Sequence, residues 1–204
     1  MSKILGYGED AFTLWALKRH VSTILNRFKD SSSPSDCLVF YRPSFGRHAK
    51  EKSSVFGEFD AIIASPQNIY LVESKWDNLV ESKKDELVIR REQLMRHQIF
   101  TWYLTHWKKK YSSKWADFTE EQQSTFNFGR KSIAPANSLL AKNLEFVLNK
   151  LLERCGAFSS DNNVKNILLF FYRGKSRAPL KINEAFTSIA IDYGIEAPNN
   201  FISL

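Results

Sequence analysis

Two acidic residues and one lysine are spaced in this sequence in a way that could support chemistry on a phosphate group. Asp60 is separated by residues 61–72 from the tripeptide Glu73-Ser74-Lys75. Carboxylate oxygens are the ligands that Mg²⁺ prefers, and the ion usually keeps several waters. A lysine ammonium beside such a pair could reach a metal-bound water or a phosphate oxygen. The residue types therefore indicate a candidate metal site.

An antiparallel hairpin is the element expected to position these residues. The apolar segments 55–64 and 69–76 have the composition of strands, and the sequence Ser-Pro-Gln-Asn at 65–68 is typical of a turn. A turn of this length makes the last residue of one strand face the first residue of the next. In that register Asp60 lies opposite Glu73.

The same register predicts that the charged side chains share one face of the hairpin. Side chains alternate across a strand, so Glu58, Asp60, Glu73 and Lys75 project together, with Glu58 opposite Lys75. Opposed residues have Cβ atoms about 4.5–5.5 Å apart, so two carboxylates there repel each other unless a cation, a proton or solvent intervenes. An ordinary solvated face is the alternative, and the apolar flanking residues disfavour it. The other face is expected to pack against a helix. It consists of Phe59, Ala61, Ile63, Tyr70 and Val72.

The order of these residues resembles a known catalytic pattern. An Asp, a short hairpin and then Glu-x-Lys is typical of the PD-(D/E)xK nuclease superfamily, which has the restriction-endonuclease-like fold. The resemblance covers residues 9–103, and it departs from the family at Phe59, where a proline often precedes the Asp. It implies a Mg²⁺-dependent deoxyribonuclease that hydrolyses DNA phosphodiester bonds in a restriction, repair or mobile-element system.

The resemblance also implies a role for each residue. Asp60, Glu73 and the main-chain carbonyl of Ser74 would bind Mg²⁺ or Mn²⁺. Lys75 would orient or activate the attacking water and stabilise the charged transition state. The physical logic is metal-ion catalysis, in which the cation clamps the scissile phosphate and neutralises developing charge.

Residues on two expected helices are further candidates for this site. Many relatives carry an acidic residue on the first helix, and Glu9 fits that place. Asp10 is the alternative, because the helical phase is ambiguous and both acids suit a helix N-terminus. RecB-like relatives place a glutamine on the helix after the hairpin, where Gln93 and Gln98 lie. A surface position is the favoured interpretation for both, and His97 is expected to be structural or exposed.

Basic side chains indicate a polyanionic partner. The formal net charge is +7, from 29 basic and 22 acidic residues. This balance favours nucleic acid, here DNA, over a membrane. Two clusters could contact backbone phosphates, and each could equally be a solvated loop. The candidates are Arg42, Arg47, Lys50 and Lys52 before the hairpin and Arg173, Lys175 and Arg177 after an apolar segment.

The remaining patterns predict an α/β protein with a central mixed β-sheet flanked by helices. The chain is expected to be a single nuclease-like domain over 1–204. Its parts would be a catalytic core at about 9–105, a helical insertion at about 112–157 and C-terminal strands at about 164–192. Helices are expected at 9–29, 80–111, 118–126 and 138–154, and further strands at 37–41, 166–172 and 186–191.

The cysteines and the apolar segments bear on the compartment. Cys37 and Cys155 lie far apart without metal-type spacing and are expected to be reduced thiols. The N-terminal segment lacks the apolar run of a signal peptide. The longest apolar stretch, 167–172, is far short of the ~20 residues that span a bilayer. A cytoplasmic protein with no membrane partner is therefore expected.

Two other functions stay open at this level. The chain could be a catalytically silent nucleic-acid-binding or assembly module on the same fold, although the intact set of Asp60, Glu73 and Lys75 argues against silence. It could also be an unrelated α/β domain whose hairpin charges coincide. Phosphate-loop and dinucleotide motifs are absent, which removes support for a nucleotide hydrolase. A homodimer or a larger complex is compatible with the sequence.

Overall fold

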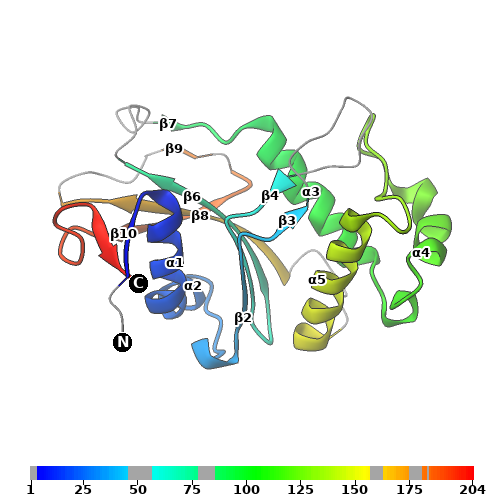
Figure 1. Ribbon diagram of the computed structural model, residues 1–204, viewed down its shortest axis with the longest axis horizontal. Coiled ribbons are helices and arrows are strands. Elements are labelled where there is room, and N and C mark those ends of the chain that lie inside the picture. The colour runs from blue at the N-terminus through cyan, green and yellow to red at the C-terminus, as the bar shows by residue number, and fades with distance from the viewer. Residues whose placement is uncertain (1–3, 46–56, 78–85, 157–162, 175–180, 183) are drawn as a thin grey trace.

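The computed structural model describes residues 4–45, 57–77, 86–156, 163–174, 181–182 and 184–204 (Figure 1). Runs of helices and runs of strands follow one another along the chain, with short 3-10 turns at Pro34–Asp36, Lys109–Tyr111 and Gln123–Thr125. In chain order the elements are β1 (Leu5–Tyr7), α1 (Glu9–Arg19), α2 (Val21–Arg27), β2 (Leu38–Tyr41), β3 (Ser44–Phe45), β4 (Gly57–Glu58), β5 (Ala61–Ala64), β6 (Ile69–Trp76), β7 (Glu86–Leu87), α3 (Arg91–His106), α4 (Trp115–Gln122), α5 (Leu139–Cys155), β8 (Val164–Tyr172), β9 (Lys181–Ile182), β10 (Thr187–Asp192) and β11 (Phe201–Ser203).

A mixed sheet lies at the centre of the fold. Within the described residues it has five strands in the order β10-β8-β6-β5-β2. The strands β10, β8 and β6 run parallel, whereas β6, β5 and β2 run antiparallel. The run Ile167–Phe171 in β8 is apolar throughout and fully buried, as expected for a parallel strand covered on both faces. The expectation of an α/β fold with a mixed central sheet is confirmed.

Helices cover both faces of this sheet. On one face α1 and α2 pack against Ala61, Ile63, Tyr70 and Val72, which confirms the helix-covered face predicted from the alternation. On the other face α3 and α5 pack against Ile62 and its neighbours. Figure 1 shows α1 and α2 grouped apart from α3 and α5.

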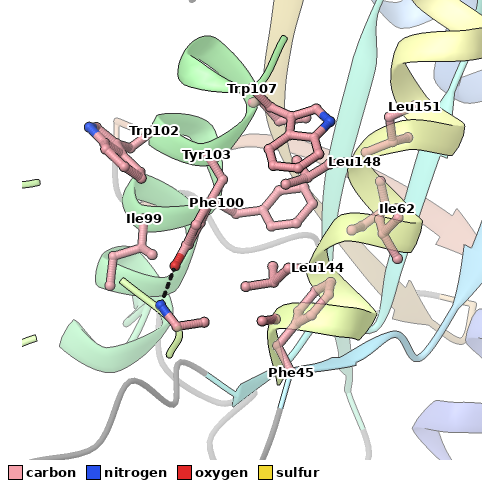
Figure 2. Close-up of a cluster of buried hydrophobic side chains, with 14 of the residues drawn as sticks. Phe45, Ile62, Ile99, Phe100, Trp102, Tyr103, Trp107, Leu144, Leu148 and Leu151 are labelled. Atoms are coloured by element: carbon pink, nitrogen blue, oxygen red, sulfur yellow. Dashed lines mark hydrogen bonds between the residues drawn. The ribbon is translucent and has the colours of Figure 1, made fainter. Parts of the chain in front are cut away.

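Aromatic side chains dominate the packing between α3 and α5. Figure 2 shows Phe100 of α3, and Trp107 directly after this helix, facing Leu144 and Leu148 of α5. Tyr103 is fully buried in this cluster, and its hydroxyl oxygen accepts a hydrogen bond of 3.0 Å from the Ala134 N–H (Figure 2). A buried tyrosine hydroxyl needs such a partner, because an unpaired polar group away from water is costly.

The hairpin register is confirmed along β5 and β6, where Ala61 faces Val72 and Ala64 faces Ile69. The prediction fails before Ala61, because the chain bends and β4 pairs with β3 instead of continuing along β6. Glu58 therefore faces Ser44 rather than Lys75.

The bend has a local cause. Arg42 has a positive φ of 49°, Gly57 has a φ of 96°, and the Arg42 guanidinium holds the Glu58 carboxylate at 2.6 Å. The alternation of side chains is interrupted at the same place. Phe59 consequently packs in the cluster with α3 and α5, opposite to the face predicted for it.

A buried carboxylate fixes the hairpin turn. Asp30 accepts hydrogen bonds from the hydroxyls of Ser65 at 2.6 Å and Tyr70 at 2.7 Å, and from the Asn68 amide at 2.9 Å. Burial opposes ionisation, but these bonds and one from the Ser32 N–H outweigh it and hold the pKa of Asp30 well below its usual range. The turn is therefore tied to the end of α2.

Several helices begin or end at other residues than the sequence predicts. The helix expected at 9–29 is two helices, α1 and α2, that meet at His20, whose dihedral angles are not helical. The helix expected at 80–111 starts only at Arg91 and ends at His106, and residues 78–85 lie outside the described part. In the described ranges no helix has the length and apolar character needed to cross a bilayer.

Candidate active site

The central sheet splits beside Asp60. The Asp60 N–H donates the last hydrogen bond of the hairpin ladder, 3.2 Å long, to the Val72 carbonyl. Beyond this point β4 leaves β6 to pair with β3. The Ser74 N–H then donates to Oδ2 of the Asp60 side chain at 2.7 Å. The carboxylate of Asp60 thus takes the place of a neighbouring strand, and this fork fixes its position next to the main chain of Glu73-Ser74.

The carboxyl group of Asp60 is harder to ionise than that of a free aspartate, because its pKa is raised. Burial raises its pKa, the charge of Glu73 raises it further, and Glu9 adds to the effect. The Ser74 N–H and the Lys75 ammonium act in the opposite direction, and the resulting pKa is about 7. The fork therefore concentrates negative charge that the surrounding protein compensates only in part.

The first residue of α1 also reaches this place. Oε1 of Glu9 lies 3.9 Å from the Lys75 ammonium. Burial raises the pKa of Glu9, and the charges of Asp10 and Glu73 add to this, while Lys75 and the Trp76 N–H oppose it. Asp10 instead forms an ion pair with Arg42. Of the two acids left open by the sequence, Glu9 is the one beside Lys75.

Side chains of α3 hold Glu73 from the other direction. The Gln93 amide donates to Oε2 of Glu73 at 2.6 Å, and its own oxygen accepts from the Arg90 N–H, which fixes the amide orientation. The Arg96 guanidinium and Nε2 of His97, the latter at 3.0 Å, both contact Oε1 of Glu73. Burial alone would raise the pKa of Glu73, which is 2% exposed, but the hydrogen bond from His97 and the charge of Arg96 outweigh it and lower the pKa.

A residue of β8 completes the support. His97 is 1% exposed, and its Nδ1 lies 2.8 Å from Oδ1 of Asn166. The Asn166 amide nitrogen donates to the Ala185 carbonyl at 3.3 Å, so its oxygen faces the histidine. Both ring nitrogens of His97 thus face oxygen atoms, on Glu73 and on Asn166.

The sequence reasoning missed part of this arrangement. The surface position predicted for Gln93 is wrong, whereas Gln98 is exposed as predicted. Arg96, His97 and Asn166 were not assigned to the site. One signal was present, because Gln93, Arg96 and His97 follow helical spacing and form a polar stripe on a helix that is otherwise largely apolar toward the sheet.

The donor set can be compared with what a divalent ion needs. In the part of the chain that the structure describes, no group of three or more His, Cys, Asp or Glu side chains could hold a metal ion. Mg²⁺ is usually bound through one or two carboxylates, with waters completing its shell. Asp60 and Glu73 fit that smaller requirement. Oε2 of Glu73 accepts from Gln93 and, like any carboxylate oxygen, has a second lone pair.

The structure describes only some of the basic residues proposed to contact DNA. Arg42 is half-buried and engaged by Asp10 and Glu58, so its charge is largely used inside the protein. Arg173 is exposed at the end of β8, where its N–H donates to the Asp77 carboxylate at 3.2 Å. The other candidates lie outside the described residues. They are Arg47, Lys50, Lys52, Lys175 and Arg177.

The cysteines lie away from the fork and are free thiols. Burial raises the pKa of Cys37, and it raises that of Cys155 to about 12. The Cys155 thiol donates to the Ser65 carbonyl at 3.0 Å. Both groups are therefore poor nucleophiles near neutral pH, because the thiolate is the reactive form.

Fold and site together define an α/β protein with buried, partly uncompensated carboxylates and a lysine at the fork of a mixed sheet. No protein-family model, curated protein or solved structure matches this chain. Inferences about function therefore depend on the residues and geometry described above.

Proposed function

We propose that this protein is a metal-dependent nuclease that hydrolyses DNA phosphodiester bonds and has the restriction-endonuclease-like fold. One observation carries the proposal: Glu9, Asp60, Glu73 and Lys75 meet at the end of β6, where the pKa of Asp60 is raised to about 7. A buried carboxylate whose charge is compensated only in part, as at Asp60, next to a second carboxylate and a lysine suits binding of a divalent cation and a phosphate. The order of the residues in the sequence points to the same chemistry.

Each residue at the fork would have its own role in catalysis. Asp60, Glu73 and the Ser74 carbonyl would hold Mg²⁺ or Mn²⁺, which when bound supplies charge neutralisation at the scissile phosphate and a more acidic water. Lys75 would donate to a phosphate oxygen and position the attacking water. Glu9 keeps the Lys75 ammonium at the fork through their 3.9 Å ion pair.

The neighbours of the acids serve to position them. The Ser74 N–H fixes Asp60, and Gln93, Arg96 and His97 hold the Glu73 carboxylate in one orientation. A preorganised site loses less entropy and needs less rearrangement when substrate binds. Arg96 and His97 are therefore positioning residues in this proposal, because they act through Glu73.

The direct test is cleavage of plasmid and linear DNA by the purified chain with Mg²⁺, Mn²⁺ or EDTA. We expect cleavage with either cation and none in EDTA. Glu9→Gln should reduce cleavage strongly, whereas Asp10→Asn is the matched control and should not, since Asp10 is paired with Arg42 away from Lys75. Absence of cleavage with every cation, or full activity of Asp60→Asn, would contradict the proposal.

A catalytically silent DNA-binding or assembly module is the second candidate. The observation that favours it is the charge compensation of Glu73 by Arg96 and His97, which needs no cation. In that case the protein would bind DNA without cutting it. Titration with Mn²⁺ separates the two functions: the nuclease should bind Mn²⁺ and lose this binding in Asp60→Asn, whereas the silent module should bind none.

A further inference from the structure

Two aromatic side chains lie exposed on the small sheet formed by β1 and β11. The strands pair antiparallel, and Tyr7 faces Phe201 across them. Their ring centroids are 5.3 Å apart, and the side chains are 55% and 51% exposed. Ile202, the next residue of β11, points inward and is buried. We call Tyr7 and Phe201 the aromatic platform.

The platform is attached to the candidate active site. The ring of Tyr7 contacts the ring of Trp76 edge-on, with centroids 5.3 Å apart and an interplanar angle of 88°. Trp76 follows Lys75 directly, and its indole N–H donates to the Tyr193 hydroxyl at 2.8 Å, which fixes the ring. Only Gly8 separates Tyr7 from Glu9 in the sequence. Side chains alternate along β6, so Trp76 and the exposed rings lie on the α1 side of the sheet, at the same end of the strand as the fork, and are held there by buried partners.

The chemistry of the platform suits unpaired nucleobases. Every base has a π-face that stacks on an aromatic ring, and in a duplex those faces are covered by neighbouring base pairs. Next to the acids of the fork, Lys75 and the exposed Arg173 at the end of β8 supply two cationic side chains for backbone phosphates. The protein also carries a net charge of +7, which favours a polyanion.

We propose that the aromatic platform stacks on unpaired nucleobases, so that the substrate is DNA with a single-stranded segment next to the scissile phosphate, such as a flap, an overhang or a junction. This inference rests on the proposed nuclease function. A second copy of the chain is a less suitable occupant. The exposed apolar set is small compared with the roughly 20–30 residues that each partner contributes to a standard interface. It consists of Ile4, Leu5, Tyr7 and Phe201.

Binding measured without cleavage tests the proposal. Fluorescence anisotropy in EDTA compares a labelled oligothymidylate with a blunt duplex. The wild type should bind the single strand more tightly than the duplex. Tyr7→Leu and Phe201→Leu keep an apolar contact but lose the π-face. Each should weaken single-strand binding roughly 5- to 150-fold. Duplex binding should stay unchanged.

Two control variants make the test specific. Tyr7→Phe keeps the ring and should bind the single strand like the wild type, which separates stacking from damage to the fold. Phe146 is 58% exposed on α5, a helix that Figure 1 shows well apart from the C-terminus. Phe146→Leu should therefore leave both affinities unchanged.

The outcomes separate this inference from the nuclease proposal. If no DNA is cut but single-strand binding is strong and lost in both leucine variants, the platform stands and the nuclease fails. If blunt duplex is cut as fast as overhang substrates and the leucine variants bind normally, the platform is refuted while the nuclease stands. If the leucine variants convert a dimer to a monomer in sedimentation with unchanged DNA affinity, the platform is a subunit interface and the inference is overturned.

Discussion

Asp60→Asn is expected to stabilise the folded protein, and the gain should depend on pH. The pKa of Asp60 is about 7 in the fold, against about 3.9 for an unperturbed aspartate in an unfolded chain. Between these values the folded state binds more protons than the unfolded state, so the stability of the wild type falls as pH rises from about 4 to about 7. The asparagine variant has no charge to accommodate and escapes this loss.

The size of the effect follows from the pKa difference. About three pKa units at about 1.36 kcal/mol each give an upper limit of about 4 kcal/mol above pH 7. Asp60 is partly accessible to solvent, which screens the repulsion, so a gain of about 1–3 kcal/mol is expected. An asparagine oxygen can still accept from the Ser74 N–H, so this hydrogen bond is retained.

Urea unfolding followed by tryptophan fluorescence in EDTA measures the gain. The unfolding free energies of variant and wild type should differ most at about pH 8 and converge near pH 4. Asp10→Asn removes a carboxylate of an exposed ion pair and should change stability by less than about 1 kcal/mol. A variant that is less stable than the wild type at pH 8, or equally stabilised at both pH values, would refute the reasoning.

Glu73→Gln should change the free energy of unfolding in the opposite direction in the same assay. The buried carboxylate of Glu73 is the partner of Arg96 and His97, and an amide leaves the charge of Arg96 uncompensated. Breaking a buried ion pair from one side costs about 3–5 kcal/mol. We therefore expect Glu73→Gln to destabilise the protein, although the sequence shows the two acids only as an equivalent, mutually repelling pair.

Four further predictions concern catalysis, binding and the hairpin turn. Lys75→Met should slow DNA cleavage roughly 10²–10⁴-fold with little change in affinity, as seen by comparing cleavage rates with binding curves. EDTA should stop cleavage and excess Mg²⁺ should restore it; cleavage that continues in EDTA would exclude the metal. DNA affinity should fall linearly with salt on logarithmic axes, at about 0.9 per phosphate contact, and neutralising Arg47, Lys50 and Lys52 together should flatten the slope. Asp30→Ala leaves buried donors at the turn without their acceptor and should lower the unfolding free energy by about 2–4 kcal/mol, which chemical denaturation measures.

The local patterns of the sequence were sufficient to predict the central part of the hairpin. Alternation from Ala61 to Ala64 and from Ile69 to Val72 determines which side chains are buried on each face, and the turn length determines the register. The prediction failed at Glu58 because this segment could pair either with β6 or with β3. Only the three-dimensional position of Ser44 decides between the two strands. Strand alternation carries no information about such a split.

The site was predictable only where its residues are close in sequence. Asp60 and Glu73 belong to one hairpin, so local rules bring them together. His97 and Asn166 are separated from it by long stretches of chain, and their contacts depend on how α3 and β8 pack against the sheet. A helical stripe of Gln93, Arg96 and His97 indicates a polar environment, but it does not identify Glu73 as the partner.

The parallel pairing of β6 with β8 determines when the fork can be completed during protein synthesis. Residues 76 and 172, which end these two strands, are 96 positions apart in the chain. At about 5–20 residues per second, roughly 5–20 s pass between their synthesis. Until then the ribosome-bound chain already contains every acid of the fork. Asn166 has not yet been made, so His97 lacks this partner and β6 lacks its parallel neighbour. The fork is therefore completed only after most of the chain has been made, and long-range pairing of this kind also makes folding slow.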